Sequence, residues 1–409
     1  IKAPWRDLDL YRWQDRLQRD GITATLRLEL RELLAPKVKL KRPFSRNGDE
    51  AEISEPKRFK QRVDWELELA ADNVYSVVAD NGQSDSWKAG LPAMIDDFRQ
   101  LLRDALDLLR ELGEAEDRDD PAYWHLPSIC PHPQNRRFHD WVALIELLRD
   151  AWLAIHRDDV IRARYIVLDW LAQPYPTFMR LALFAATCDG VAPDGEWVDW
   201  LLANEGWWLW SVQTQSETMR LLVLRGAQLP DVQKIRLEAA ILDGPPRRPD
   251  MTPERWENLV NHKVWLRLAK FTSGGAHLGR DAEIRFAGLL ADHPTLALAS
   301  NEKDEFSHWM SGTGDADYED QRIVDRAPRT RHDLAVWLKR EPAEGFFDED
   351  NWRETCRERF FVSACALCDL ARDNCWPAER WREALQTWSD DKFVQRAWRF
   401  LAPLLRDMT

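Results

Sequence analysis

The stretch WLLANEGWWLWSVQTQSETMRLLVLRG, residues 200–226, decides the fold. Its apolar residues recur every three or four positions, as they do along one face of a helix, and Gly206 interrupts the pattern where a helix C-terminus is expected. A second helix is predicted to open at Trp207 and to carry the apolar stripe on to Val223. Two helices joined by so short a connection lie antiparallel, so a helical hairpin is expected here.

The same unit is predicted immediately upstream. The tripeptide DWL at residues 169–171 reappears at residues 199–201, an offset of 30 residues. A period of about 20 to 50 residues is typical of solenoids, whose units cannot bury their apolar faces alone. Two interpretations remain open: a degenerate array of HEAT or tetratricopeptide-like repeats, and an irregular all-helical domain with the same hydrophobic pattern. In the array, Trp170 and Trp200 hold equivalent places, and both are expected to be buried.

The composition is that of a soluble, well-packed helical protein. The chain of 409 residues holds 44% hydrophobic and 31% charged residues, and its 22 tryptophans mostly fall within helical stripes, where core packing is their default role. A net charge of −13 and a pI near 5.3 argue against a protein whose main task is binding nucleic acid. No segment reaches the roughly 18 uninterrupted apolar residues of a spanning helix, so membrane insertion is not expected.

Three regions are expected along the chain. Residues 1–115 hold a helix, a small β-sheet insertion and a long helix, residues 116–300 hold the helical array, and residues 301–409 hold a loop followed by further helical repeats. The chain starts at Ile1 without a secretory leader pattern, so we expect a piece of a longer polypeptide. Six cysteines in a chain of this length do not make a disulfide framework, and a reduced, cytoplasmic setting is expected.

The first region switches from helical to alternating periodicity. A short amphipathic helix is expected over residues 5–17, which Gly21 ends. Over residues 22–30 apolar and polar side chains alternate, the period-two pattern of a half-buried strand. Further strands of this small antiparallel sheet are expected at residues 38–40, 63–69 and 74–78. A long amphipathic helix then follows over residues 91–113.

The most basic stretch of the chain surrounds the expected hairpin. It comprises Lys37, Lys39, Lys41, Arg42, Arg46, Lys57, Arg58, Lys60 and Arg62. Phosphate contact by a basic hairpin is one interpretation. The other is that lysines on an exposed edge strand block unwanted strand pairing. The acidic balance of the whole chain favours the second, so nucleic acid is not expected as a partner.

A zinc site has to be weighed at the proline-rich connection, where His125, Cys130, His132 and His139 cluster. The C-x-H spacing differs from the paired C-x-x-C and H-x-x-x-H ligands that suit tetrahedral zinc, and no second pair follows at the usual distance. We therefore expect no metal here. His132 and His139 are instead expected to cap or satisfy nearby backbone groups.

Cys365 and Cys368 form a C-x-x-C motif, with Cys356 and Cys375 close by. The surrounding residues 360–370 are largely apolar and predict a buried helix, in which small cysteines are ordinary core residues. No strand precedes the motif, as a thioredoxin-like site would require. The cysteines are therefore expected to be structural.

Motifs for nucleotide binding and for nucleophilic catalysis are absent from the sequence. Gly274, Gly275 and Gly279 lack the lysine and the spacing of a phosphate-binding loop, and neither a G-x-S-x-G nor an H-E-x-x-H motif occurs. We expect no catalytic residue, cofactor site or metal site in this chain.

Several stretches are similar to a known group of proteins. They are YWHLPSICPHPQNRRFHDWVALIELLRDAWLA at residues 123–154, PYPTFMRLALFAAT at 174–187, EGWWLWSVQTQSETMRLL at 205–222 and ACALCDLARDNCWPAERWREALQTWSD at 364–390. They resemble the helical C-terminal region of large bacterial antiphage defence proteins, which carry a sirtuin-like or other effector domain and often a STAND-type NTPase core. The resemblance spans most of the chain and lies in helical packing motifs, with no catalytic signature. It implies a sensor that binds a phage protein, while NAD or nucleotide hydrolysis belongs to domains outside these residues.

Two functional hypotheses follow. In the first, the chain is an interaction module, with no enzymatic activity of its own, that recognises a phage-encoded protein along a solenoid surface and self-associates through its parent protein. In the second, it is a nucleic-acid binder or a metal-dependent enzyme that uses the basic hairpin or the His and Cys clusters.

Overall fold

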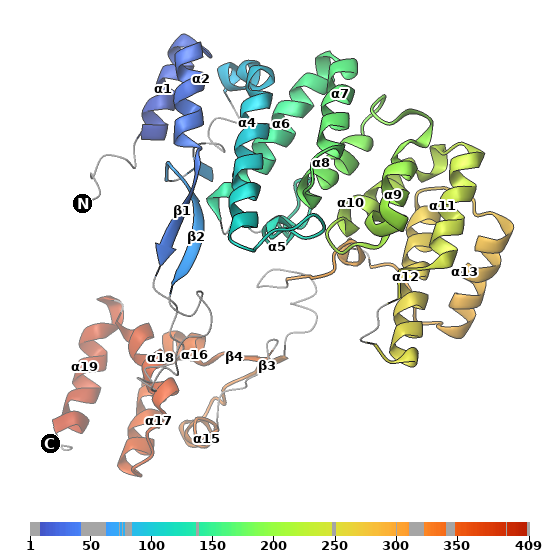
Figure 1. Cartoon of the computed structure of the whole chain (residues 1–409). Helices are drawn as coiled ribbons and strands as arrows, with labels where there is room; N and C mark the ends of the chain where they lie inside the picture. The colour runs from blue at the N-terminus through green and yellow to red at the C-terminus, as the bar shows by residue number, and fades with distance from the viewer. Residues whose placement is uncertain are drawn as a thin grey trace. The chain divides into compact units, whose positions relative to one another are not determined.

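The computed structural model describes residues 9–41, 63–72, 74–75, 77, 84–135, 139–247, 251–299, 301–310, 323–340, 348–389 and 391–406. The described chain is mainly helical, as the sequence predicts, and also holds two small two-stranded sheets (Figure 1). It divides into two compact units, Ile1–Trp309 and Met310–Thr409, here called the N-terminal and the C-terminal unit. No helix among the described residues combines the length and the apolar character needed to cross a membrane.

The N-terminal unit begins with a helical pair and a hairpin. Its first elements are α1 (Asp9–Asp20), α2 (Ala24–Leu33), β1 (Pro36–Lys41), β2 (Asp64–Leu69) and α4 (Asp85–Glu111). β1 and β2 pair antiparallel, with Pro36 opposite Leu69 and Lys41 opposite Asp64. The predicted first helix, the two strands at residues 38–40 and 63–69, and the long helix are confirmed over the described residues.

The strand expected over residues 22–30 is wrong, because that segment forms α2. Thr23 caps the helix, accepting a hydrogen bond from the Leu26 N–H at 3.2 Å. Leu26 and Leu30 are spaced for one helical face as well as for one strand face, and both are buried. Trp13 of α1 donates its indole N–H to the Leu26 carbonyl at 2.7 Å, which fixes the pair. The fourth strand is wrong too, since the described residues 74, 75 and 77 are helical.

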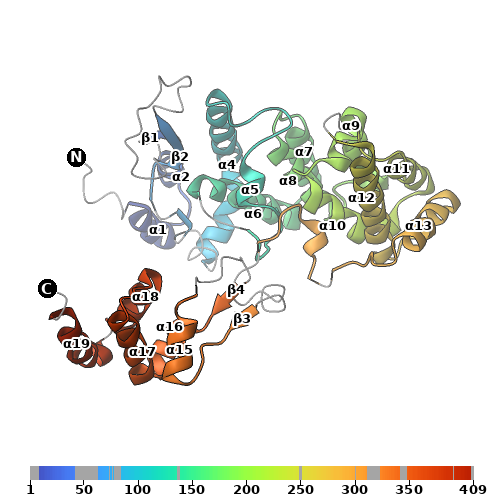
Figure 2. The same ribbon diagram turned by 90° about the horizontal axis from the view of Figure 1, so that it is seen from below.

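Helices continue through the rest of the N-terminal unit. They are α5 (Ala122–His125), α6 (Ala143–Asp158), α7 (Val160–Leu171), α8 (Pro176–Ala186), α9 (Trp197–Trp210), α10 (Gln215–Arg225), α11 (Asp231–Asp243), α12 (Pro253–Ser273) and α13 (Arg280–Asp292), with short 3₁₀ turns at Asp140–Val142, Pro193–Gly195, Gly226–Gln228 and Lys303–Glu305. Both ribbon views show these helices following one another from α4 to α13 (Figures 1 and 2). Thr252 caps α12, because its side chain accepts a hydrogen bond from the Arg255 N–H at the start of the helix.

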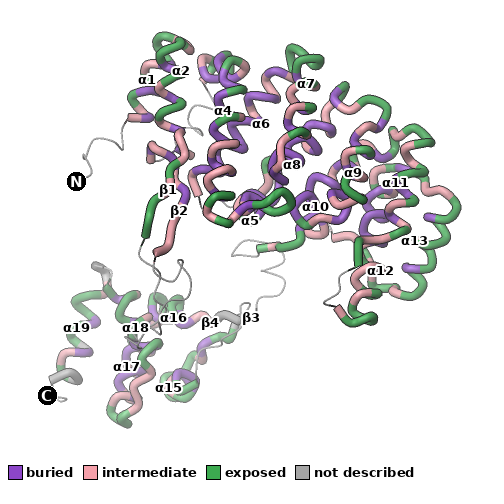
Figure 3. Tube along the Cα trace, in the orientation of Figure 1, coloured by how far each residue is buried: buried purple, intermediate pink, exposed green. Residues whose placement is uncertain are grey.

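Helix contacts order this unit in space. α6 packs on α4 and α7, α7 packs on α8, and α8, α10 and α12 pack in succession, while α11 contacts α9, α12 and α13. α6 and α8 are buried along most of their length, whereas α13 is largely exposed (Figure 3). The central helices α6, α8, α10 and α12 therefore supply much of the apolar core.

The tryptophan-rich stretch breaks where Gly206 predicts, but its second helix is not continuous. Ala203 to Gly206 leave the helical conformation, and the φ angle of Gly206 is 74°. The helix resumes only as far as Trp210, Ser211 is extended, and α10 starts at Gln215. The polar residues that follow Trp210 thus divide what the apolar stripe predicted to be one helix.

The tripeptide alignment at 30 residues is wrong at its tryptophans. Trp170 lies at the C-terminal end of α7 and is buried, whereas Trp200 lies in the first turn of α9 and is only partly buried. The carboxylates beside them also differ in partner, since Asp169 pairs with Arg99 and Asp199 pairs with Arg236. The two tryptophans therefore do not hold equivalent places.

The C-terminal unit has its own core. Its elements are β3 (Ile323–Asp325), α15 (Arg331–Trp337), β4 (Asp348–Asp350), α16 (Trp352–Glu358), α17 (Phe360–Arg372), α18 (Ala378–Trp388) and α19 (Asp391–Arg406). Trp337, Trp352, Phe360 and Trp388 are buried together at its centre. β3 and β4 form a parallel pair that the sequence did not predict, and residues 311–322 of the expected loop lie outside the described residues.

Candidate functional site

The histidines of the proline-rich connection do not form one group. The rings of His125 and His139 are in contact, with centroids 4.4 Å apart. The ring of His132 instead packs on that of Phe306, with centroids 4.5 Å apart. His132 Nδ1 accepts the Gln134 N–H at 3.0 Å, which confirms that this ring satisfies the backbone. For His139 that prediction is wrong, because its Nδ1 lies 3.2 Å from the Glu66 carboxylate. Over the described chain, no three His, Cys, Asp or Glu side chains are placed to hold a metal ion.

His125 and His139 line a pocket of about 240 Å³ beside β2, here called the histidine pocket. Its other lining residues are Lys41, Asp64, Trp65, Glu66, Leu67, Leu109, Glu114, Pro121 and Trp141. The Trp65 indole donates to the Glu114 carboxylate at 3.0 Å. His125 Nδ1 is buried and has no hydrogen-bond partner among the residues that the structure describes. The pocket thus combines indole walls with several acceptor groups.

Both histidines are held neutral by their surroundings. Burial, together with the smaller effect of the neighbouring His139, lowers the pKa of His125 to about 4. Burial also lowers the pKa of His139, and the nearby ammonium of Lys41 lowers it as well. Neutral imidazoles at neutral pH can accept hydrogen bonds, which protonated ones cannot.

The buried His125 should make folding depend on pH. Its pKa in the folded state is about 4, below the unfolded value of about 6.5, so the unfolded chain binds the extra proton between these values. Above about pH 6.5, His125 is neutral in both states and does not lower the free energy of unfolding. As the pH falls towards 4, the unfolded chain gains the proton first and the free energy of unfolding decreases. Urea unfolding at pH 7 and pH 5 measures this loss. The His125→Gln variant, which cannot titrate there, should lose less stability over the same interval, and identical pH profiles would contradict the assignment.

A buried ion pair joins α8 and α10. Arg180 Nε lies 3.3 Å from the Glu217 carboxylate, and the two side chains are 0% and 2% exposed. Arg180 also donates to the Leu126 carbonyl at 2.5 Å, while Glu217 accepts the Ile129 N–H at 2.8 Å. The pair therefore ties two helices to the proline-rich connection. Because Glu217 is committed to these partners, it is not placed as a free acid or base.

A second buried carboxylate, Asp120, is also occupied by the fold. It accepts hydrogen bonds from the Thr177 N–H at 2.8 Å, from the Thr177 hydroxyl at 2.9 Å and from the Ala122 N–H at 3.0 Å. Burial raises the pKa of Asp120, and the bonds from Thr177 oppose that rise. These bonds cap the start of α8 and of α5, so their role is structural.

The lysines of the basic hairpin are matched by carboxylates on the neighbouring strand. Lys39 Nζ lies 2.5 Å from Glu68, and Lys41 forms an ion pair with Glu66. Lys37 donates to the Ala70 carbonyl at 3.3 Å. The two carboxylates on β2 offset the positive charge of the lysines on β1. Such pairing is expected of lysines on an edge strand rather than of a phosphate-binding surface. The other basic residues, Arg42, Arg46, Lys57, Arg58, Lys60 and Arg62, lie outside the described residues.

The cysteine motif lies on α17, as predicted. Cys356 and Cys368 are buried and Cys365 is half-buried. Burial raises the pKa of the Cys356 and Cys368 thiols, which disfavours the reactive thiolate. Cys356 and Cys368 therefore pack in the core of the C-terminal unit, and Cys375 is partly buried against it.

The glycines at the end of α12 serve packing. A Cβ at Gly274 would collide with the Val223 carbonyl, so this glycine lets the end of α12 approach α10. Gly279 lies just before α13, where its N–H donates to Glu238 at 2.9 Å. A carboxylate already fills the place that a phosphate would take.

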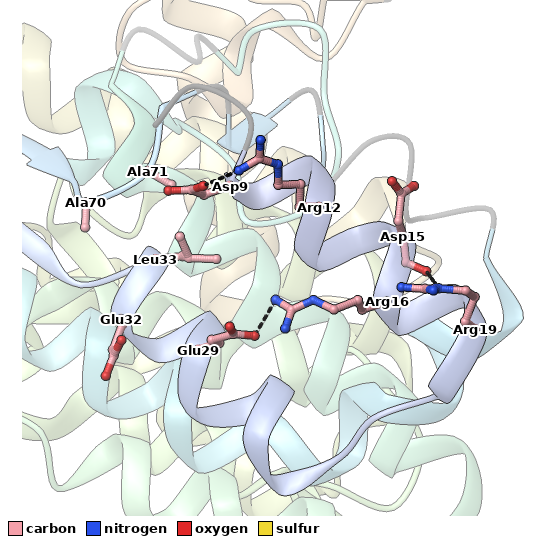
Figure 4. A pocket seen from close by; sticks show the side chains of 10 residues that line it. All are labelled: Asp9, Arg12, Asp15, Arg16, Arg19, Glu29, Glu32, Leu33, Ala70 and Ala71. Atoms are coloured by element: carbon pink, nitrogen blue, oxygen red, sulfur yellow. Dashed lines mark hydrogen bonds and ion pairs between the residues drawn. The ribbon is translucent and has the colours of Figure 1, made fainter. Parts of the chain in front are cut away.

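A pocket of about 750 Å³ lies beside α1 and α2 (Figure 4). Arg12, Arg16 and Arg19 line it from one face of α1, at the spacing of successive helical turns. Arg16 lies 2.5 Å from Glu29, and Arg12 lies 3.6 Å from Asp9. The lining holds four carboxylates (Asp9, Asp15, Glu29 and Glu32) against three guanidinium groups, so its net charge does not favour an anion.

An exposed apolar row follows α7. Ile161, Tyr165 and Leu168 are 73%, 69% and 41% exposed, and their spacing of four and three residues places them on one helical face. We name these three residues the α7 stripe. Beside it, α4 and α7 enclose a groove of about 530 Å³ that Ile95 and Ile166 line with apolar atoms.

Charged groups border this groove. Arg99 of α4 pairs with Asp169 of α7, and Asp96 lies 3.8 Å from Arg99. Arg162 donates to the Pro92 carbonyl at 3.3 Å. An apolar centre within a charged border is the arrangement of a protein-binding patch.

The α7 stripe was missed from the sequence, although one signal was present. The helix VIRARYIVLDWL has apolar residues on more than one face, which ordinarily predicts a helix buried all round. Only Ala163, Val167 and Trp170 are buried. Which apolar face is left uncovered depends on the neighbouring helices and cannot be read from periodicity.

Comparison with known proteins gave no match among family models, curated proteins or solved structures. The likeness to antiphage defence proteins therefore stays a prediction.

Proposed function

We propose that this chain is a protein–protein interaction module and that the α7 stripe is the centre of its binding surface. The observation that carries the proposal is the exposure of Ile161, Tyr165 and Leu168 in one row beside an apolar groove. Leaving such a row in water is unfavourable, at roughly 25 cal/mol per Å² of apolar surface, and a partner protein removes that cost.

The chemistry of the surface fits recognition of a folded partner. Tyrosine combines a rigid apolar ring with a polar hydroxyl and is among the residues enriched in binding hot spots. Tyr165 stands between Ile161 and Leu168, while Arg162 and Asp96 supply polar groups at the border of the groove. An amphipathic helix of the partner, laid along the groove between α4 and α7, would bury the row and leave the charges at its rim.

We further infer that the N-terminal unit is a degenerate HEAT or tetratricopeptide-like array. The succession of contacts from α4 through α6, α7 and α8 to α10 and α12, with α11 and α13 packed alongside, supports this.

The biological role that we propose is that of a sensor in a larger bacterial antiphage defence protein. Its support is the resemblance of the four quoted stretches, which implies a phage-encoded protein as ligand, an effector domain outside this chain, self-association of the parent protein and a cytoplasmic setting. The isolated chain should hydrolyse neither NAD nor ATP. Turnover that survives purification and disappears on replacing Cys365, Cys368 or His132 would favour the metal-dependent enzyme instead.

Substitutions on the α7 stripe test the proposal. The full chain serves as bait in phage-infected cells, captured proteins are identified by mass spectrometry, and the binding of each purified protein is then titrated. Tyr165→Ala should weaken binding by roughly 30-fold or more, the loss expected at a hot spot, and Ile161→Asp should abolish it.

The matched control is Ile284→Asp, which places the same charge at an exposed isoleucine on α13. It should leave the affinity within about twofold of the wild type, as expected away from the contact. Equal affinity of all three variants for the partner would rule out the α7 stripe as the binding surface.

A further inference from the structure

We propose that the histidine pocket binds a small organic cation, such as a primary amine or a guanidinium group. The pocket lies within the N-terminal unit, between β2, the end of α4 and the proline-rich connection. It does not include the α7 stripe, and the proposal is independent of protein binding.

The walls of the pocket provide aromatic faces. Trp65 and Trp141 line it together with the rings of His125 and His139, and Leu67, Leu109 and Pro121 complete its apolar surface. Indole rings carry negative charge on their faces and attract ammonium and guanidinium ions more strongly than other aromatic side chains do. The volume of about 240 Å³ suits a group of a few heavy atoms rather than a nucleotide.

The polar groups in the pocket are chiefly hydrogen-bond acceptors. Glu66 and Glu114 present carboxylates, and Asp64 adds a third at the edge. His125 Nδ1 is buried with no partner in the described part of the chain, and the neutral ring can offer this nitrogen as an acceptor. A ligand rich in N–H donors satisfies this set, whereas an anion would meet three carboxylates.

The surrounding charges create a negative field at this end of the hairpin. Burial raises the pKa of Asp140, which adjoins His139, and the carboxylates of Asp72 and Glu68 raise it further. Lys41 is the positive group in the lining, and its ion pair with Glu66 balances one carboxylate. Its side chain is 43% exposed, and its ammonium competes with a bound cation for the Glu66 carboxylate.

Calorimetric titration of the full chain tests the proposal. The probes are putrescine, agmatine and Nα-acetyl-lysine methylamide, with 1,4-butanediol as the neutral analogue of putrescine. We expect saturable one-to-one binding of the cations and none of the diol. Binding of the lysine derivative alone would assign the site to a side chain of a partner polypeptide, and binding of the free amines would assign it to a small metabolite.

Variants of the carboxylates and of Lys41 make the test specific. Glu66→Gln should weaken binding by roughly 10-fold or more, because a charge-assisted hydrogen bond is lost. Glu111→Gln, near the end of α4 and outside the lining, is the matched control and should change the affinity little. Lys41→Met removes the competing ammonium and should strengthen binding, an opposite effect that an unfolded variant cannot imitate.

Two results would overturn the proposal. One is the absence of saturable binding for every cation while the chain retains its circular dichroism spectrum. The other is binding that is equal for putrescine and 1,4-butanediol, or unchanged in both Glu66→Gln and Lys41→Met.

Discussion

Replacing Arg180 with methionine should lower the free energy of unfolding by about 3 to 5 kcal/mol. The substitution leaves the Glu217 carboxylate, which is 2% exposed, without its guanidinium partner. One backbone N–H, from Ile129, would remain to solvate that charge. The change also removes the bond from Arg180 to the Leu126 carbonyl. Urea unfolding followed by far-ultraviolet circular dichroism measures the loss.

A surface pair provides the control. Arg236 and Asp199 form an ion pair whose side chains are about half exposed, so Arg236→Met should cost less than about 1 kcal/mol. The double variant Arg180→Met, Glu217→Leu should recover a large part of the stability lost in Arg180→Met, because it removes the unpaired charge. A double variant as unstable as the single one would show that Arg180 acts through packing and not through Glu217.

The ion pair also illustrates what the sequence could not predict. The run from Gln213 to Thr218 is polar at every position and, by composition, is typical of a surface loop. In the structure all six side chains are buried. Their partners come from distant segments: Gln213 donates to the Asp120 carbonyl at 3.2 Å, and Gln215 donates to the Asp304 carbonyl at 3.3 Å. Such long-range pairing leaves no periodic signal.

Local signals were sufficient for many helices. The cap at Thr252, the apolar face of α4 and the apolar residues of α17 each specify a helix through contacts within a few residues. Over residues 22–30 the local signal was ambiguous, because leucines at every second position also include pairs spaced by four. In the structure this segment is helical, and the hydrogen bond from the Trp13 indole to the Leu26 carbonyl holds it against α1.

The candidate sites were predictable in part. His125 and His139 were singled out from their residue types, and the structure places them together in one pocket. The sequence could not supply Glu66 and Trp65 from β2, because the pairing of β2 with β1 and its packing near residues 140–142 bring them there. The α7 stripe escaped for the opposite reason: its residues look like core, and only the arrangement of α6 and α8 around α7 leaves them uncovered.

The second large effect is expected at Trp170. Its side chain is 1% exposed, and its ring centroid lies 6.0 Å from that of the buried Trp152. Trp170→Ala should lower the free energy of unfolding by about 3 to 5 kcal/mol, through lost apolar contact and the cavity left behind. The Trp170 Nε1 group has no hydrogen-bond partner among the described residues, so Trp170→Phe should cost much less than the alanine.

Trp200→Ala is the comparison that tests the different places of the two tryptophans energetically. Trp200 is only partly buried, at the edge of both cores of the N-terminal unit, so its loss should cost roughly 1 to 2 kcal/mol. Equal costs at Trp170 and Trp200, measured by urea unfolding under one set of conditions, would mean that the two tryptophans are equivalent as a regular repeat requires. Unequal costs would mean that any array in this chain has a different period. The free energy lost on substitution depends on how deeply the side chain is buried, and a matching tripeptide sequence does not determine that burial.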